Sequence, residues 1–137
     1  METVNTGRTV KLEIVRQDSE NGATRVEKFE VPYRPGMNVI SALMHIQKYP
    51  VTADGQKTTP VSWDMNCLEE VCGACSMVIN GRPQQSCSAL VDKLTQPIRL
   101  EPMKTFPVIR DLQVDRERVF NALKKVKAWG PIDGTYD

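Results

Sequence analysis

All four cysteines of this 137-residue chain lie within residues 67–87, in the stretch CLEEVCGACSMVINGRPQQSC. They are Cys67, Cys72, Cys75 and Cys87, so their spacing is C-x4-C-x2-C-x11-C. The first three thiols fall in one short segment, and a longer interval separates them from the fourth. The chain therefore has to fold back on itself if the four sulfurs are to meet.

The longer interval carries a hairpin signal. Asn80-Gly81 lies between two runs that can form strands, and an Asn-Gly pair in that setting is the strongest short-range signal for a β-hairpin. If these two residues form the turn, Cys75 lies opposite Ser86, which directly precedes Cys87. The predicted hairpin thus returns the fourth sulfur to the other three.

The spacing of the first three cysteines, with a fourth further along, matches the plant-type [2Fe–2S] ferredoxin pattern. Each ferric iron of such a cluster takes two thiolates in addition to the two bridging sulfides. We therefore predict that Cys67, Cys72, Cys75 and Cys87 bind a [2Fe–2S] cluster. No set of acid–base or nucleophilic side chains stands out, so we expect electron transfer without substrate catalysis by this chain.

Other uses of the cysteines compete with this interpretation, and zinc is the main one. A structural zinc site usually has two C-x-x-C knuckles, whereas this chain has only Cys72-Gly73-Ala74-Cys75. Two disulfides are possible by number, but the cysteine content is low and no secretory signal precedes them. A thioredoxin-like pair would lie at a strand-to-helix junction, and here a predicted strand follows.

Composition restricts the classes of partner. The net charge of +1 gives no electrostatic case for binding nucleic acid or an anionic membrane surface. The N-terminal stretch METVNTGRTVKLEIV lacks the apolar block of a signal peptide, and no apolar run is long enough to span a bilayer. We therefore expect a soluble, intracellular chain without a direct membrane span.

Upstream of the cysteines, the hydrophobic pattern predicts two strands and a helix. Residues 10–14 and 27–31 alternate apolar and charged side chains, and the polar residues 18–22 between them favour a hairpin. Asn38 is a candidate N-cap for a helix over residues 39–46.

Downstream, residues 98–100 predict a last strand. The order strand, strand, helix, metal loop, strand, strand is that of the β-grasp fold of plant-type ferredoxins, which is an argument by analogy. We predict an α+β fold with a 2Fe-2S ferredoxin-like β-grasp domain over residues 1–105. A C-terminal helical extension over residues 106–137 would lead toward a second domain.

The predicted extension contains one amphipathic helix, for which Asp115 is a candidate cap. Its apolar stripe at helical spacing is formed by Val119, Phe120, Leu123 and Val126. Two interpretations are open. The helix packs back on the sheet, or it is the first piece of a second domain that this chain does not contain.

These segments together resemble a known family. Residues 63–90, WDMNCLEEVCGACSMVINGRPQQSCSAL, are similar to the N-terminal [2Fe–2S] segment of the iron–sulfur subunit of succinate dehydrogenase and fumarate reductase. The similarity extends upstream over residues 34–47, RPGMNVISALMHIQ, and downstream over residues 99–116, RLEPMKTFPVIRDLQVDR. It is greatest to the menaquinone-reducing succinate dehydrogenases of Bacillus-like bacteria.

The resemblance implies an oxidoreductase of the respiratory chain and the tricarboxylic acid cycle. In that family the β-grasp domain accepts electrons from the FAD of a flavoprotein subunit, and Cys67, Cys72, Cys75 and Cys87 match its cluster ligands. A helical C-terminal domain carries [4Fe–4S] and [3Fe–4S] clusters and leads to quinone at a cytochrome b-type membrane anchor. The expected location is the cytoplasmic face of the bacterial cell membrane, peripheral through partner subunits.

Two features depart from the family pattern. No cysteine follows Cys87, so the expected ligands of the second domain are absent and we expect a fragment or truncated product of a longer subunit. After the first ligand many members read Arg-Glu-Gly, whereas this chain reads Leu68-Glu69-Glu70. If glycine serves a positive φ there, Glu70 has to adopt that uncommon conformation.

Three functions are compatible with the sequence. The first is the electron-transfer subunit of succinate dehydrogenase, with fumarate reductase as the same interpretation in reverse. The second is a free-standing ferredoxin, although a +1 chain does not suggest the acidic docking face of such carriers. The third is a zinc-stabilised interaction module without redox function.

The other conspicuous residues are expected to be structural. His45 is the only histidine, whereas a Rieske site needs two, so it is not expected to bind the cluster. Trp63 and Met65 are expected to pack against the core.

We predict that Glu70→Gln raises the reduction potential of the cluster. Reduction adds one negative charge to an anionic cluster, and a carboxylate in the ligand loop disfavours that charge. Redox titration of the cluster-loaded chain measures the midpoint. An unchanged or lower midpoint in the variant would contradict the prediction.

Overall fold

A computed structural model describes residues 7–130 of the chain. Its elements in chain order are β1 (Thr9–Gln17), β2 (Thr24–Pro32), α1 (Val39–Lys48), β3 (Ser76–Ile79), β4 (Arg82–Gln85), the 3-10 turn η1 (Val91–Lys93), β5 (Ile98–Glu101), β6 (Val108–Arg110), β7 (Gln113–Val114) and α2 (Glu117–Lys125).

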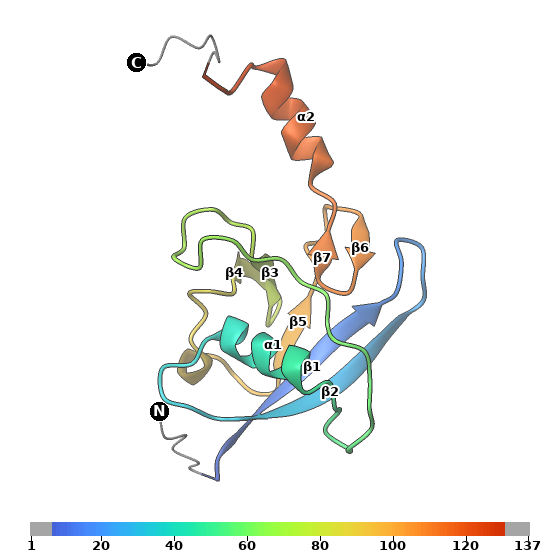
Figure 1. The fold of residues 1–137 in the computed structure, drawn as a ribbon, viewed down its shortest axis with the longest axis vertical. Helices are drawn as coiled ribbons and strands as arrows, with labels where there is room; N and C mark the ends of the chain where they lie inside the picture. Colours follow the sequence, from blue (N-terminus) through green and yellow to red (C-terminus); the bar gives the residue numbers. More distant parts are fainter. Residues whose placement is uncertain (1–6, 131–137) are drawn as a thin grey trace.

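Five strands form one mixed sheet in the order β2-β1-β5-β3-β4, and α1 crosses one of its faces (Figure 1). Strands β1 and β2 are antiparallel, whereas β1 and β5 run parallel with Leu12 opposite Ile98. The last predicted strand of the domain therefore lies at the centre of the sheet, between the first hairpin and the second. This arrangement confirms the predicted α+β, ferredoxin-like fold.

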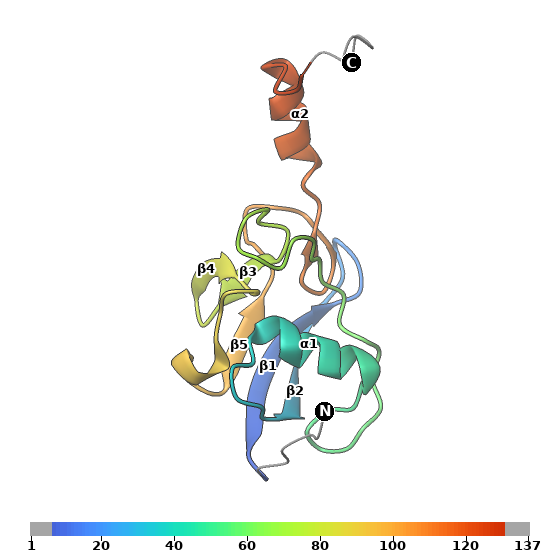
Figure 2. The ribbon, with the colours of Figure 1, turned by 60° about the vertical axis from the view of Figure 1, so that its left-hand side comes forward.

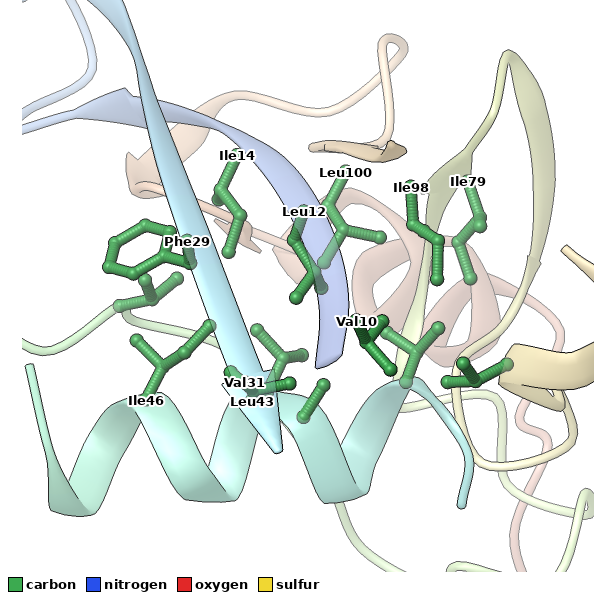
Figure 3. Close-up of a cluster of buried hydrophobic side chains, with 14 of the residues drawn as sticks. Val10, Leu12, Ile14, Phe29, Val31, Leu43, Ile46, Ile79, Ile98 and Leu100 are labelled. Carbon is green, nitrogen blue, oxygen red and sulfur yellow. The ribbon is translucent and has the colours of Figure 1, made fainter. Parts of the chain in front are cut away.

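The core lies between the sheet and α1. Alternate residues of β1 point toward the helix, so Val10, Leu12 and Ile14 are buried while their neighbours are exposed or half-buried. From the other side, α1 contributes Leu43 and Ile46, which point toward the sheet in Figure 3. Removal of these apolar surfaces from water is the main driving force for this packing.

The N-terminus of α1 has the predicted cap. Asn38 Oδ1 accepts a hydrogen bond from the Ser41 backbone N–H at 2.9 Å, and Ser41 Oγ accepts one from the Asn38 backbone N–H at 3.4 Å. This reciprocal pair satisfies two donors that the first helical turn would otherwise leave unpaired.

The hairpin of β3 and β4 also has the predicted turn. Asn80 and Gly81 both adopt positive φ, 48° and 80°, as a two-residue turn of type I′ requires. The flanking residues Ile79 and Arg82 pair across the strands. The sequence signal therefore fixes the register of the hairpin that leads to Cys87.

The chain after residue 105 differs from the predicted helical extension in its first part. A short antiparallel hairpin, β6 and β7, forms before the helix, because Leu112 and Val114 turn inward and are buried. The helix begins at Glu117, and its N-cap is Arg116 and not Asp115 as predicted. Asp115 lies one residue earlier, where its Oδ1 accepts a hydrogen bond from the Glu117 backbone N–H at 2.8 Å. The domain boundary at residue 105 remains a prediction.

Helix α2 stands away from the sheet in both ribbon views (Figure 2). None of its residues is buried, and Phe120 on its apolar stripe is 58% exposed. The interpretation that this helix packs back on the sheet is therefore wrong for the described residues. Among residues 7–130, no helix is both long and apolar enough to cross a membrane.

A buried ion pair fastens the β6–β7 hairpin to the sheet. Arg16 continues the inward series of β1, and its side chain, like that of Asp111, is completely buried. Its Nε–H donates to Asp111 Oδ1 at 2.9 Å, and Nη2 donates to Asp111 Oδ2 at 3.2 Å. The guanidinium also contacts Glu27 and donates to the Thr59 backbone oxygen at 3.1 Å.

The same carboxylate holds backbone from two other segments. Gln17 N–H donates to Asp111 Oδ1 at 3.1 Å, and Ser62 N–H donates to Oδ2 at 2.9 Å. Asp111 thereby connects the end of β1 with the segment that leads into the cysteine loop. A buried charge is tolerated only when it is paired and hydrogen-bonded in this way.

We predict that Asp111→Ala lowers the free energy of unfolding by about 3–5 kcal/mol, because it leaves the Arg16 charge buried without its main partner. The control is Asp18→Ala, which removes an exposed ion pair with Arg25 and should cost less than about 1 kcal/mol. Urea denaturation measures both variants. Equal losses in the two would show that the buried pair does not stabilise the fold.

Candidate metal centre

The four cysteines lie on a loop and at both ends of one hairpin. Cys67 and Cys72 are on the loop, Cys75 directly precedes β3, and Cys87 follows β4. Ser86 N–H donates to the Cys75 carbonyl at 3.2 Å, and Ser86 Oγ donates to the same oxygen at 2.7 Å. The predicted pairing of Cys75 with Ser86 is confirmed, and it places Cys87 beside the loop.

Backbone N–H groups of the loop point at cysteine sulfurs. Cys72 N–H donates to Cys67 Sγ at 3.3 Å, and Glu69 N–H donates to the same sulfur at 3.4 Å. Ala74 N–H donates to Cys72 Sγ at 3.4 Å. The N–H groups of Glu69, Cys72 and Val71, in that order of effect, lower the pKa of Cys67 to about 7. The loop is therefore built to favour thiolate sulfur over thiol.

Three residues of the loop have left-handed backbone conformations, which turn these N–H groups inward. They are Leu68 with φ 59°, Glu70 with φ 63° and Gly73 with φ 74°. The expectation that Glu70 adopts a positive φ is confirmed, and only the glycine does so without steric strain. Successive N–H groups that converge in this way form a concave site for an anion.

Cys87 completes the group of sulfurs. Burial raises the pKa of its thiol, and Cys75 raises it further by hydrogen bonding and by charge, while the Cys67 charge adds a smaller increase. The thiols of Cys75 and Cys87 are therefore hydrogen-bond neighbours. Asn38 Nδ2 donates to the Cys87 carbonyl at 2.8 Å, so the residue that caps α1 also anchors the fourth cysteine.

The donor set fits a two-iron cluster. Cys67 with Cys72, and Cys75 with Cys87, form two contacting pairs, and each iron of a [2Fe–2S] cluster takes two thiolates. Within residues 7–130, no three His, Cys, Asp or Glu side chains gather around a single point as one metal ion would require. A two-iron cluster does not need that arrangement, because its ligands are divided between two centres.

Other residues considered from the sequence lie apart from the cysteines or differ from expectation. The His45 ring on α1 packs against Tyr49, the residue that follows the helix, with ring centroids 5.1 Å apart. Trp63 packs against the core, as predicted. Met65 does not, because it is 47% exposed, so the prediction that it joins the core is wrong.

Comparison with known proteins defines the class. A family model described as "2Fe-2S iron-sulfur cluster binding domain" matches residues 11–121. The chain belongs to this family, and its cofactor is a [2Fe–2S] cluster.

Particular relatives are more informative about its place in the family. The succinate dehydrogenase iron-sulfur subunit of Bacillus subtilis is 69% identical over 130 residues, which are 95% of this chain and 51% of that protein. The fumarate reductase iron-sulfur subunit of Mycobacterium tuberculosis is 35% identical over 122 residues, 88% of this chain and 47% of that protein.

A solved structure has the same fold. A chain of the "Mycobacterium smegmatis Sdh1 complex in the apo form" matches with a TM-score of 0.70 and 26% identity, over 94% of this chain and 53% of that chain. The present chain thus spans about half the length of the relatives that it matches.

Proposed function

We propose that this chain is the [2Fe–2S] electron-transfer part of a succinate dehydrogenase iron–sulfur subunit. It passes single electrons from the FAD of a flavoprotein subunit toward further iron–sulfur clusters and quinone. The observation that carries this proposal is the convergence of Cys67, Cys72, Cys75 and Cys87, from a loop and a hairpin, in a member of the cluster-binding family. The relatives include a fumarate reductase iron–sulfur subunit, and in that alternative the chain would pass electrons in the reverse direction.

The four cysteines are assigned here as the cluster ligands. When bound, the cluster supplies one site that accepts and releases a single electron. The protein's part is to hold the sulfurs with N–H donors already in position, as Glu69, Cys72 and Ala74 do. Donors that point at sulfur stabilise the added negative charge of the reduced state and raise its potential.

The ligand loop also offers a surface for the electron donor. Val71 is 76% exposed and Leu68 is 46% exposed, so two apolar side chains project beside the cysteines. A flavoprotein that covered them would gain apolar burial and approach the cluster closely, without any catalytic group on this chain. Glu69 and Glu70 are exposed on the same loop and give it a negative charge.

The exposed stripe of α2 supports the second interpretation of the C-terminal segment. Val119, Phe120 and Leu123 are each at least 45% exposed, and they are at the spacing of a buried helix face. In this proposal residues 106–137 link the cluster domain to a helical domain with [4Fe–4S] and [3Fe–4S] clusters. That domain contacts a cytochrome b-type anchor, which gives a peripheral position at the cytoplasmic face of the membrane.

The test is reduction of the cluster by succinate. The cluster-loaded chain is combined with an FAD-containing succinate dehydrogenase flavoprotein, and EPR spectra are recorded after addition of succinate and then of dithionite. We expect the signal of a reduced [2Fe–2S] cluster with either reductant. A Cys87→Ala variant should lose the signal, whereas Ser88→Ala, at the exposed neighbouring position, should keep it.

Two other outcomes would contradict the proposal. A cluster that dithionite reduces but succinate does not would favour the free-standing ferredoxin, because the flavoprotein would then not be its donor. A colourless protein that contains zinc and gives no signal with either reductant would favour the zinc-stabilised interaction module.

A further inference from the structure

Arg116 connects the approach to α2 with the cysteine loop. It is half-buried and lies between β7 and α2. Its Nη1–H donates to the Gly73 carbonyl at 2.9 Å, and its Nη2–H donates to the Ala74 carbonyl at 2.9 Å. One guanidinium thus donates hydrogen bonds to two successive carbonyls between Cys72 and Cys75, a geometry that the planar fork of arginine allows.

The hydrogen bond from Arg116 to the Gly73 carbonyl involves the same peptide unit that contacts the Cys72 sulfur. The Gly73 carbonyl and the Ala74 N–H belong to the same planar peptide unit, in which the two groups point in opposite directions. On one side this unit accepts from Arg116, and on the other it donates to Cys72 Sγ at 3.4 Å. Because Gly73 has a positive φ of 74° and no side chain, its backbone has more rotational freedom than that of other residues. Ser76 N–H donates to the Gly73 carbonyl at 3.1 Å, and the arginine adds a second donor that further restricts that freedom.

The charge of Arg116 is not neutralised by an ion pair in the described part of the chain. None of the ion pairs found among residues 7–130 includes it, and its buried Nε–H has no acceptor there. A guanidinium stays protonated at any physiological pH. A positive charge beside the ligand loop favours the reduced cluster, which carries one more negative charge than the oxidised one.

We propose that Arg116 is a positioning residue for the [2Fe–2S] cluster. It fixes the Gly73-Ala74 peptide so that its N–H points at Cys72 Sγ, and its charge raises the reduction potential. This role rests on the assignment of the four cysteines as cluster ligands. It separates into a geometric part, which depends on two hydrogen bonds to carbonyls, and an electrostatic part, which depends on charge alone.

The test compares Arg116→Gln, Arg116→Lys and Arg118→Gln in the cluster-loaded full chain. Arg118 is the matched control, since it is two positions further along, exposed, and placed over the Phe106 ring. The midpoint potential is measured by EPR-monitored titration. Hydrogen–deuterium exchange is measured on the peptide that contains Ala74.

In Arg116→Gln we expect the equilibrium constant for one-electron reduction to fall roughly tenfold, a lowering of about 59 mV, together with faster exchange at Ala74. Arg116→Lys keeps the charge but not the planar fork, so its midpoint should stay near that of the parent while exchange still accelerates. Arg118→Gln should change neither quantity.

The proposal is overturned if Arg116→Gln matches Arg118→Gln in both midpoint and exchange. If Arg116→Gln does not retain a cluster, the lysine variant decides: faster exchange at Ala74 supports the proposal, and exchange at the parent rate overturns it. Loss of the cluster from Arg116→Lys, with retention in Arg118→Gln, contradicts the proposal, because the lysine keeps the charge and is expected to keep the midpoint near that of the parent. A wrong ligand assignment has a different signature, because the parent chain would then hold no cluster, and the proposal would fall with it.

Discussion

The interaction on which this structure depends is the hydrogen bonding of cysteine sulfurs by backbone N–H groups. Glu69 and Cys72 donate to Cys67 Sγ, and Ala74 donates to Cys72 Sγ, so the protein itself solvates these sulfurs. The donors reach the sulfurs only because the backbone at Leu68, Glu70 and Gly73 is left-handed. A loop with this shape is strained at its non-glycine residues, so the rest of the fold has to hold it in place.

Three attachments hold the site from different directions. The β3–β4 hairpin fixes Cys75 and Cys87 to each other through Ser86, and the α1 cap residue Asn38 anchors the Cys87 carbonyl. The buried pair of Arg16 and Asp111 fixes the segment that enters the loop. The sheet and its core thus serve as a rigid support, while the ligand loop itself remains at the surface, where an electron donor can approach it.

The sequence was most informative where the signal was local. The Asn-Gly turn predicted the hairpin register and the pairing of Cys75 with Ser86, whereas the assignment of the four cysteines as cluster ligands stays a prediction. The cap at Asn38 was predicted because a helical pattern begins at the residue that follows it. Arg16 was missed, although it continues the alternating inward series of β1, because a charged residue is normally read as exposed. Its partner Asp111 is 95 positions away, and no local pattern connects the two. The contact of Arg116 with the loop, the left-handed Leu68 and the short β6–β7 hairpin also depend on tertiary packing.

The metal and sulfide content of anaerobically purified protein tests most directly whether the loop and hairpin hold a two-iron cluster. We expect about two irons and about two acid-labile sulfides per chain, in a red-brown sample. About one zinc per chain without sulfide, or no metal at all, would contradict this expectation.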